Sequence, residues 1–421
     1  MTERLIHVVG NRLAHPATAP ALVRNHPGWQ QSLARGIPGI ALLHIELAAT
    51  GRAPWQPAHD WLTAAAAAPL TVGPDSHPFH GGPALAHALA CAAEHRPGSY
   101  RSALQALEEQ MIADTDARLA AAHLRLDRKQ PPEITEYDVI RGLTGYGAYL
   151  LRRRPDSPTL RRVLDYLVRL THPIIHDGET LPGWWTLSGP SGRPDARFPG
   201  GHANAGVAHG IAGPLSLLAL ATLQGIGTDR QHDAIDEISR WLDHWTSPPG
   251  GGPAWPYWIT REEHRSRCPR PAGAVRPSWC YGAAGLARAL QLAALARGDG
   301  ARRLRAEHAL ATALTDPARL AATTDISLCH GYAGLAHLAA RVAADAHAET
   351  RARLDSLIPH LLEAVAPPDP RGQEEAADAL LRTADGSGAG LLDGAAGVAL
   401  AVLAAGTGRT ASRWDTCLLT A

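Results

Sequence analysis

The strongest constraint on the fold of this 421-residue chain is a pattern that occurs seven times. Each copy has two glycines separated by two residues, and a run rich in alanine and leucine follows. The copies begin at Gly36 and Gly39, Gly81 with Ala84 in place of the second glycine, Gly142 and Gly145, Gly210 and Gly213, Gly282 and Gly285, Gly331 and Gly334, and Gly394 and Gly397. One such copy would indicate only close helix packing, but seven copies over nearly the whole chain indicate structural repeats.

Each interval between successive copies is long enough for two helices and a connection. The runs after the glycines have helical spacing, as with Leu286, Leu290 and Ala293 at i, i+4 and i+7. Glycine at a helix start lets two backbones approach closely or supplies a positive φ. Each repeat is therefore predicted to be a helical hairpin.

Open arrays of hairpins need terminal repeats with a polar outer face. The first and last copies in this chain are as apolar as the middle ones, so a closed ring suits the pattern better than an open array. We predict an all-α fold, an α/α toroid (barrel) of seven helical hairpins with about fourteen helices.

Segments rich in proline and glycine at 172–201, 247–278 and 366–374 are predicted to be loops within a single domain that spans residues 1–421. The first two carry aromatic groups that are typical of short β-hairpin extensions: Trp184 and Trp185, then Trp255, Tyr257 and Trp258. These groups either cover the mouth of the ring or form the walls of a cleft for an extended peptide.

The composition of the chain disfavours several classes of function. Lysine plus arginine equals aspartate plus glutamate at 40 each, so no overall field favours nucleic acid or an anionic membrane. No apolar run reaches the length of a transmembrane segment, and the first residues do not resemble a secretory signal. The five cysteines (Cys91, Cys268, Cys280, Cys329 and Cys417) favour metal or catalytic use over a disulfide framework, and we expect a cytoplasmic protein.

Aligning the repeats on their first glycine puts a polar residue directly before it in every copy: Arg35, His80, Arg141, His209, Tyr281, His330 and Asp393. In a ring, these equivalent positions converge on one central cavity. One position further back, Cys280 and Cys329 are equivalent residues of adjacent repeats. We therefore expect Cys280, Cys329 and His330 to meet, and two thiolates with one imidazole form a ligand set that zinc prefers. Three protein ligands leave a fourth position open, as in catalytic zinc sites.

Other candidate residues surround this set. His209 has no cysteine before it, so it is better suited to be a free acid or base, and Asp138 could fix its tautomer. Arg276 and Trp279 precede Cys280 closely. Structural roles remain as alternatives: a cysteine at a helix start is usually a small core residue, Asp138 could be a helix cap, and Arg276 could be a surface residue.

The sequence resembles the lanthipeptide cyclases of the LanC-like family. The resemblance rests on Trp279-Cys280-Tyr281-Gly282, Cys329-His330-Gly331, the stretch GVAHGIAGP around His209, and the repeats. It implies an α/α toroid with one zinc ion per chain, bound by Cys280, Cys329 and His330. It also implies addition of precursor-peptide cysteine thiols to dehydroalanine or dehydrobutyrine, which forms lanthionine and methyllanthionine rings.

Site roles follow from that reaction. An enolate forms as the thiol adds, and Arg276, which matches the arginine of the family, is expected to stabilise it. His209, oriented by Asp138, is expected to protonate the enolate carbon. Trp279 and Tyr281 are expected to shape the substrate pocket, with Tyr281 as a hydrogen-bond donor. The expected partners are a dehydrated precursor peptide and a separate dehydratase, and the protein acts in the cytoplasm, alone or in a membrane-associated complex.

The chain departs from the family pattern at Ala84, and at Arg141, where many relatives carry an acidic residue. Some relatives insert a small lobe, and the sequence leaves open whether 151–200 hosts one. Alternative functions are addition of glutathione to dehydrated proteins and a non-catalytic zinc-containing scaffold that binds peptides. A zinc hydrolase would more often use histidine and carboxylate ligands, and a glycosidase would need opposed carboxylates, for which only Asp138 and Asp393 are candidates.

Overall fold

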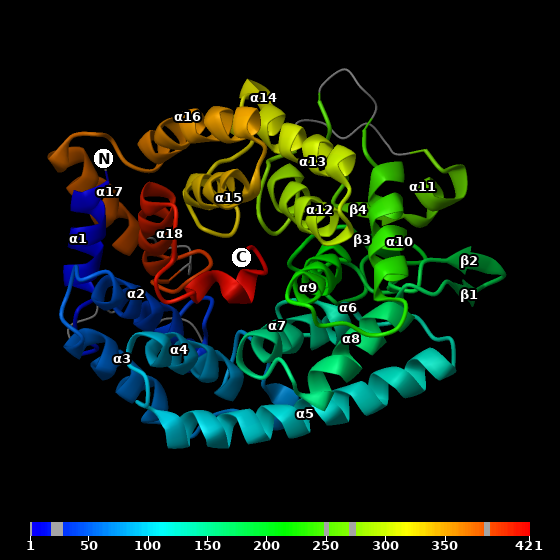
Figure 1. The fold of residues 1–421 in the computed structure, drawn as a ribbon, viewed down its shortest axis with the longest axis horizontal. Helices are drawn as coiled ribbons and strands as arrows, with labels where there is room; N and C mark the ends of the chain where they lie inside the picture. The colour runs from blue at the N-terminus through cyan, green and yellow to red at the C-terminus, as the bar shows by residue number, and fades with distance from the viewer. Residues whose placement is uncertain (1, 18–27, 248–251, 269–274, 383–387) are drawn as a thin grey trace. The chain divides into compact units, whose positions relative to one another are not determined.

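The structure is a computed structural model that describes residues 2–17, 28–247, 252–268, 275–382 and 388–421 (Figure 1). The chain divides into two compact units. The first comprises residues 1–111 and 323–415, and the second comprises 112–322 and 416–421. A single domain over residues 1–421 stays a prediction.

A buried helix begins after the first glycine of every repeat, as predicted. Six of the seven first glycines are the N-cap of that helix, and in the fourth repeat the cap is Ile211. Almost every residue of these helices is buried, because they are apolar on all sides. The helices are α2 (Ile37–Ala49), α4 (Gly82–His95), α7 (Leu143–Arg153), α9 (Ala212–Leu223), α12 (Ala283–Arg297), α15 (Tyr332–Asp345) and α18 (Ala395–Thr407).

Partly exposed helices complete the hairpins, each with one buried face. In five repeats the partner follows directly in sequence and packs on the buried helix: α3 on α2, α8 on α7, α10 on α9, α13 on α12 and α16 on α15. The partly exposed helices are α3 (Gln56–Ala66), α5 (Arg101–Asp127), α8 (Pro158–Leu170), α10 (Gln231–His244), α13 (Gly300–Ala313), α16 (Ala348–Val365) and α17 (Pro370–Leu381).

The described residues hold eighteen α-helices, more than the fourteen or so predicted, because the loops contain short helical turns. These are α6 (Ile134–Tyr137), α11 (Arg261–Ser266) and α14 (Pro317–Ala321). The other addition is α1 (Glu3–Arg12), which packs against α17 and α18 (Figure 1). The N-terminal helix thus supplies the partner that the last repeat lacks in sequence.

Of two antiparallel strand pairs, the first is a β-hairpin within a long loop, as expected, and the second joins strands that are far apart in the sequence. β1 (Ile174–His176) pairs with β2 (Glu179–Leu181), and β3 (His202–Asn204) pairs with β4 (Trp258–Thr260). Residues 151–200 contain the end of α7, all of α8, and the β1–β2 pair. Among the described helices, none is both long and apolar enough to cross a membrane.

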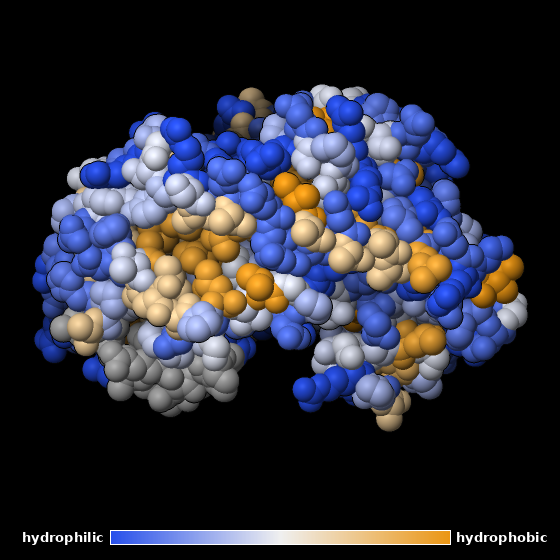
Figure 2. Space-filling model, turned by 90° about the horizontal axis from the view of Figure 1, so that it is seen from below, coloured by the Kyte–Doolittle hydropathy of each residue, from blue (hydrophilic) through white to orange (hydrophobic). Residues whose placement is uncertain are grey.

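Apolar side chains gather in places on the surface. On the face drawn in Figure 2, apolar residues form a patch on the left of the view and a band to the right of its centre, with hydrophilic residues around them. The large apolar residues that are most exposed belong to different parts of the chain: Val72, Leu124, Ile175, Leu187, Leu223 and Leu304. Scattered exposed residues of this kind are normal for a folded surface.

The second glycine of the repeat is required by a close backbone contact. A Cβ atom built on Gly39, Gly213, Gly285, Gly334 or Gly397 would lie closer than 3.0 Å to the carbonyl oxygen six residues earlier in the chain. Real Cβ atoms essentially never come this close to another atom. In these five repeats, the turn before the buried helix therefore folds directly onto the first turn of that helix.

Backbone hydrogen bonds connect the turns of successive repeats. In the first unit, the N–H of Leu33 donates to the Phe79 carbonyl at 3.0 Å, and the N–H of Cys329 donates to the Leu392 carbonyl at 2.9 Å. In the second unit, the N–H of Val207 donates to the Cys280 carbonyl at 3.0 Å. The last repeat continues the series into the first, because the Leu392 N–H donates to the Ala34 carbonyl at 2.9 Å.

A buried ion-pair network stabilises the first unit near the end of the chain. Asp415 is fully buried, and its carboxylate lies 2.6 Å from the Arg341 guanidinium and 3.2 Å from Nε2 of His337. Burial alone would raise the pKa of this carboxyl, but His337 and Arg341 outweigh burial and lower the pKa well below its usual range. Asp415 therefore stays ionised inside the protein.

Replacing Gly397 by alanine is expected to destabilise the fold by about 1–3 kcal/mol, because the new methyl group collides with the Leu391 carbonyl. The matched control is Gly406→Ala in the same helix, where nothing lies within 4 Å of the new Cβ. That change is expected to stabilise the fold by about 0.4–1 kcal/mol. Urea unfolding measures both; equal effects would contradict the close-contact explanation.

Asp415→Asn is expected to destabilise the fold by about 3–5 kcal/mol at neutral pH, because it removes the buried carboxylate that pairs with Arg341 and His337. Because the folded-state pKa of Asp415 is lowered, the stabilisation is present above the ordinary aspartate pKa of about 3.9 and is lost as the pH falls below it. The difference from wild type should thus shrink in acid. Asp378→Asn, which removes an exposed ion pair, should change stability by about 0.5 kcal/mol or less in thermal unfolding.

Candidate functional site

The first unit holds a compact group of metal-binding side chains. The Sγ atom of Cys329, a ring nitrogen of His330 and a carboxylate oxygen of Asp393 all lie within 4.8 Å of one another. Cys329 and His330 end the turn before α15, and Asp393 ends the turn before α18. The hydrogen bond from the Cys329 N–H to the Leu392 carbonyl joins these two turns and accounts for their proximity.

His330 is held in one orientation by a second carboxylate. Nδ1 of His330 lies 2.6 Å from Oδ2 of Asp325, and the Ser327 hydroxyl lies 3.2 Å from the same nitrogen. Burial raises the pKa of Asp325, but the hydrogen bonds from His330 and Ser327 outweigh it, and the pKa lies at about 2. An ionised carboxylate only accepts, so Nδ1 carries the proton and Nε2 is directed to the other side. Histidines that bind metals usually have this arrangement.

The second unit brings Asp138 and His209 together. Asp138 caps the C-terminus of α6, is fully buried, and accepts the N–H groups of Arg141 and Gly142 through Oδ1 at 2.6 and 2.7 Å. Its other oxygen lies 2.6 Å from Nδ1 of His209, whose side chain is about one-third exposed. Asp138 is therefore both a helix cap and the group that orients His209.

Cys280 is buried in the turn before α12. Its Sγ atom lies 3.6 Å from the Ser278 hydroxyl, and its carbonyl accepts the N–H of Val207 at 3.0 Å. Gly206 lies against this turn, since a Cβ there would collide with the Cys280 carbonyl and the Tyr281 ring. The segment before α9 thus packs directly on Cys280 and Tyr281.

Tyr281 is the centre of a polar and aromatic cluster in the same unit. Its hydroxyl accepts a hydrogen bond from Nδ2 of Asn204 at 3.1 Å, and burial raises its pKa to about 12. The rings of Tyr257 and Trp258 lie 5.2 and 5.8 Å from its ring. A tyrosine that stays protonated at neutral pH can donate its hydroxyl proton in a hydrogen bond.

Arg276 is partly exposed, and its carbonyl accepts the Tyr257 hydroxyl at 3.2 Å. Gly282 has a φ of 103°, and a Cβ there would meet the Arg276 carbonyl. Gly282 and Gly81 are first glycines that are needed for a positive φ as well as for close approach. The loop that carries Arg276 is thereby folded back onto the start of α12.

Several predicted aromatic residues are packed inside the second unit. Trp279 is 2% exposed and donates its indole N–H to the Leu418 carbonyl at 3.0 Å, so its part in a substrate pocket stays a prediction. Trp184, Trp185 and Trp255 are buried as well. Of the two aromatic groups in the loops, only Tyr257 and Trp258 therefore combine partial exposure with a position beside Tyr281.

The predicted site residues thus form two groups. Cys329 and His330 lie together in the first unit, and Asp138, His209, Cys280, Tyr281 and Arg276 belong to the second. That Cys280 shares a metal ion with Cys329 and His330 stays a prediction. Asp325 and Asn204 were not predicted from the sequence. Each lies five positions before a histidine of the repeat motif, His330 and His209, and this spacing is the signal that could have found them.

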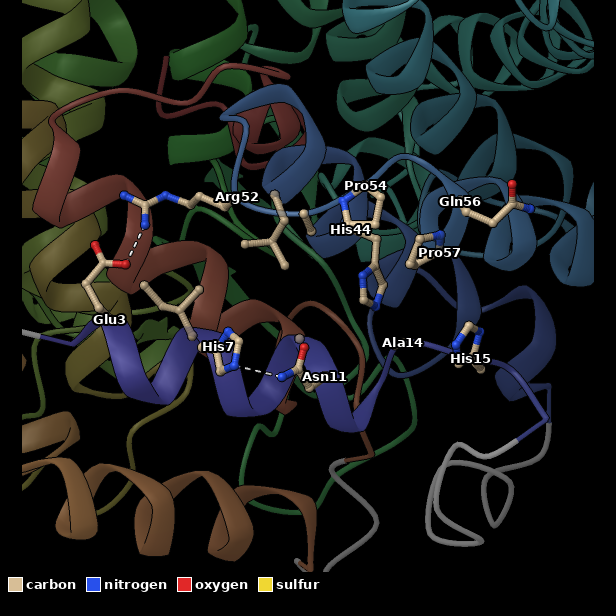
Figure 3. A pocket seen from close by; sticks show the side chains of 14 residues that line it. Glu3, His7, Asn11, Ala14, His15, His44, Arg52, Pro54, Gln56 and Pro57 are labelled. Carbon is tan, nitrogen blue, oxygen red and sulfur yellow. Dashed lines mark hydrogen bonds and ion pairs between the residues drawn. The ribbon is translucent and has the colours of Figure 1, made fainter.

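A separate hollow of about 420 Å³ lies between α1 and the start of α3 (Figure 3). None of the predicted site residues lines it. Glu3 pairs there with Arg52, and His7 with Asn11. Burial lowers the pKa of His44 to about 4, and its ring N–H donates to the Leu13 carbonyl at 2.7 Å. These side chains are paired as structural groups.

Solved structures identify the fold class. The chain is similar to a solved structure of nisin cyclase with a TM-score of 0.77 and 21% sequence identity, covering 100% of this chain and 96% of that chain. This likeness shows the predicted fold, the all-α toroid.

A family model for the Lanthionine synthetase C-like protein matches residues 28–419. The chain belongs to this family. It is also similar to the nisin biosynthesis protein NisC of Lactococcus lactis subsp. lactis, with 26% identity over 213 residues. That alignment covers 50% of this chain and 49% of the relative, so the chain spans about half the length of the curated relative it matches.

Replacing Asp138 by asparagine tests its role towards His209. The asparagine carbonyl can still accept the N–H groups of Arg141 and Gly142, but its NH₂ group cannot accept from Nδ1 of His209. We expect the neutral His209 ring to move its proton from Nδ1 to Nε2, which ¹⁵N NMR of the imidazole detects. His202, whose Nδ1 donates to the Ser188 carbonyl, should keep its signals. An unchanged His209 tautomer would rule out this role for Asp138.

Proposed function

We propose that this protein is a zinc-dependent lanthipeptide cyclase. It adds cysteine thiols of a precursor peptide to dehydroalanine or dehydrobutyrine in the same peptide, forming lanthionine or methyllanthionine thioether rings. The observation that carries the proposal is that Cys329 and His330 lie together, with His330 oriented by Asp325, in a chain of the Lanthionine synthetase C-like family. The addition moves no atoms in or out, so substrate and product have the same mass.

One zinc ion per chain is held, in this proposal, by Cys280, Cys329 and His330. The donor types fit, because two thiolates and an imidazole are ligands that zinc prefers. The hydrogen bond from His330 to Asp325 also fits, since it fixes the tautomer that leaves Nε2 as the ligand atom. When bound, the ion favours the thiolate form of a coordinating substrate cysteine.

The groups of the second unit act on the alkene in this proposal. Addition of sulfur to the β-carbon moves an electron pair towards the carbonyl oxygen and forms an enolate. Arg276 stabilises that negative charge, and Tyr281 donates a hydrogen bond. His209 gives the α-carbon a proton, and Asp138 stabilises the imidazole in the required tautomer.

The reaction needs a peptide that has already lost water from its serine or threonine residues. The proposed partners are therefore a dehydrated precursor peptide and a separate dehydratase. Tyr257 and Trp258, partly exposed beside Tyr281, supply a surface that suits an extended peptide. We propose that the protein acts in the cytoplasm, alone or within a membrane-associated biosynthetic complex.

Replacing Cys329 by alanine tests the proposal. We expect bound zinc to fall from about one ion per chain to nearly none by elemental analysis, with loss of ring formation. Ring formation is measured by treating the dehydrated Cys-containing peptide with an alkylating reagent after the reaction, because closed thioethers leave no thiol to alkylate. Cys280→Ala and His330→Ala should behave alike. Cys91→Ala, which changes another buried cysteine, should keep both zinc and activity.

Three outcomes would contradict the proposed function or the proposed ligand set. If the zinc-loaded wild-type protein leaves every peptide thiol alkylatable, the scaffold alternative gains support. If the protein instead adds glutathione to the dehydrated peptide, seen as an increase in the mass of the peptide, the alternative function of glutathione addition gains support. If Cys280→Ala keeps its zinc while Cys329→Ala loses it, the proposed ligand set is wrong.

A further inference from the structure

Asp393 is a carboxylate beside the proposed metal ligands to which the family resemblance gives no role. It directly precedes the first glycine of the last repeat, the position that His330 has in its own repeat. Oδ1 of Asp393 lies 3.4 Å from Nε2 of His330, and both side chains are about one-quarter exposed. Asp393 therefore meets the imidazole on the side opposite to Asp325.

The two carboxylates impose a conflict on His330. With a neutral ring, the N–H at Nδ1 donates a hydrogen bond to Asp325, so Nε2 presents a lone pair towards the Asp393 oxygen. Two acceptors that face each other repel, unless a proton or a metal cation lies between them. The Cys329 sulfur lies within the same 4.8 Å group and adds a third electron-rich atom. These three atoms are thus arranged so that a metal cation could lie between them.

The backbone fixes these atoms in place. The N–H of Cys329 donates to the carbonyl of Leu392, the residue before Asp393, and the N–H of Leu392 donates to the Ala34 carbonyl. Asp393 is followed by Gly394, where a Cβ would collide with the Gly390 backbone, so the turn has little freedom to move. The carboxylate reaches His330 through a short, constrained side chain.

We propose that Asp393 is the resting fourth ligand of the zinc ion and is displaced by the substrate thiol. This inference rests on the proposed function, because it takes Cys280, Cys329 and His330 as the other ligands. Aspartate oxygen is an accepted ligand of zinc, and four ligands complete a tetrahedral site.

The exchange balances in charge. As the substrate binds, its S–H bond breaks and the proton passes to solvent. The sulfur then forms a bond to the metal while the Asp393 oxygen releases its bond. A carboxylate and a thiolate each carry one negative charge, so the charge of the complex is unchanged. Asp393 would thereby keep water and other ligands out of the position that the substrate sulfur needs.

The test uses the full chain loaded with Co²⁺, whose near-ultraviolet sulfur-to-cobalt absorption increases with each bound thiolate. Two dissociation constants are measured, one for Co²⁺ and one for β-mercaptoethanol added to the Co²⁺-loaded protein. In Asp393→Asn, we expect the metal to bind about 10- to 100-fold more weakly, because a charged ligand is lost. We expect the thiol to bind more tightly, because it no longer displaces a carboxylate. Asp393→Ala should give the same two signs.

Asp325→Asn is the matched control, since it changes the other carboxylate on the same imidazole. It should weaken metal binding by disturbing the orientation of His330, yet leave the dissociation constant of the thiol unchanged. A weaker affinity for metal together with a tighter affinity for thiol therefore distinguishes a displaced ligand from a residue that only orients His330.

Each remaining outcome decides the matter. If Asp393→Asn leaves metal binding unchanged, Asp393 is not a ligand. If Asp393→Asn weakens metal binding but leaves the dissociation constant of the thiol unchanged, as we expect for Asp325→Asn, Asp393 only orients His330. In both cases the proposed function stands. If the wild-type chain binds no Co²⁺, or Cys329→Ala binds it equally well, the proposed zinc site itself fails, and this inference fails with it.

Discussion

The close contact between the turn before a buried helix and the first turn of that helix, which five repeats share, governs the rest of the structure. It requires a position without a side chain, and Gly397 and its equivalents supply it. Because the turn is folded tightly, its backbone groups point sideways and join the turn of the next repeat, as from Cys329 to Leu392. Side chains on these turns are therefore positioned by backbone geometry.

The chemistry of the site is a consequence of this repetition. His330 and Asp393 occupy one repeat position, and the hydrogen bond between their turns brings both to the same place. His209 occupies the equivalent position in the second unit, where its partner is Asp138 from the turn of the preceding repeat. One backbone arrangement thus presents side chains that could hold a metal ion in one unit and a hydrogen-bonded histidine–aspartate pair in the other.

Much of the fold was predictable because glycine spacing and apolar runs are local signals. The seven buried helices and their hairpin partners follow from them, whereas the pairing of β3 with β4 joins distant segments and was not predicted. The part played by α1 was not predictable, since its packing on α18 depends on where the two ends of the chain meet. Within the site, Cys329 and His330 stand out by type, whereas Asp325 and Asn204 were missed because their contacts depend on the exact path of a turn.

The hydrogen bond from the Leu392 N–H to the Ala34 carbonyl also affects how the protein folds during its synthesis. The first unit is assembled from residues 1–111 and 323–415, so its N-terminal part leaves the ribosome long before the segment that it must pair with. At ordinary rates of translation, that delay is on the order of tens of seconds. Apolar helices such as α2 stay uncovered on one side throughout it. The nascent chain is thus a natural client for chaperones until its final helix emerges.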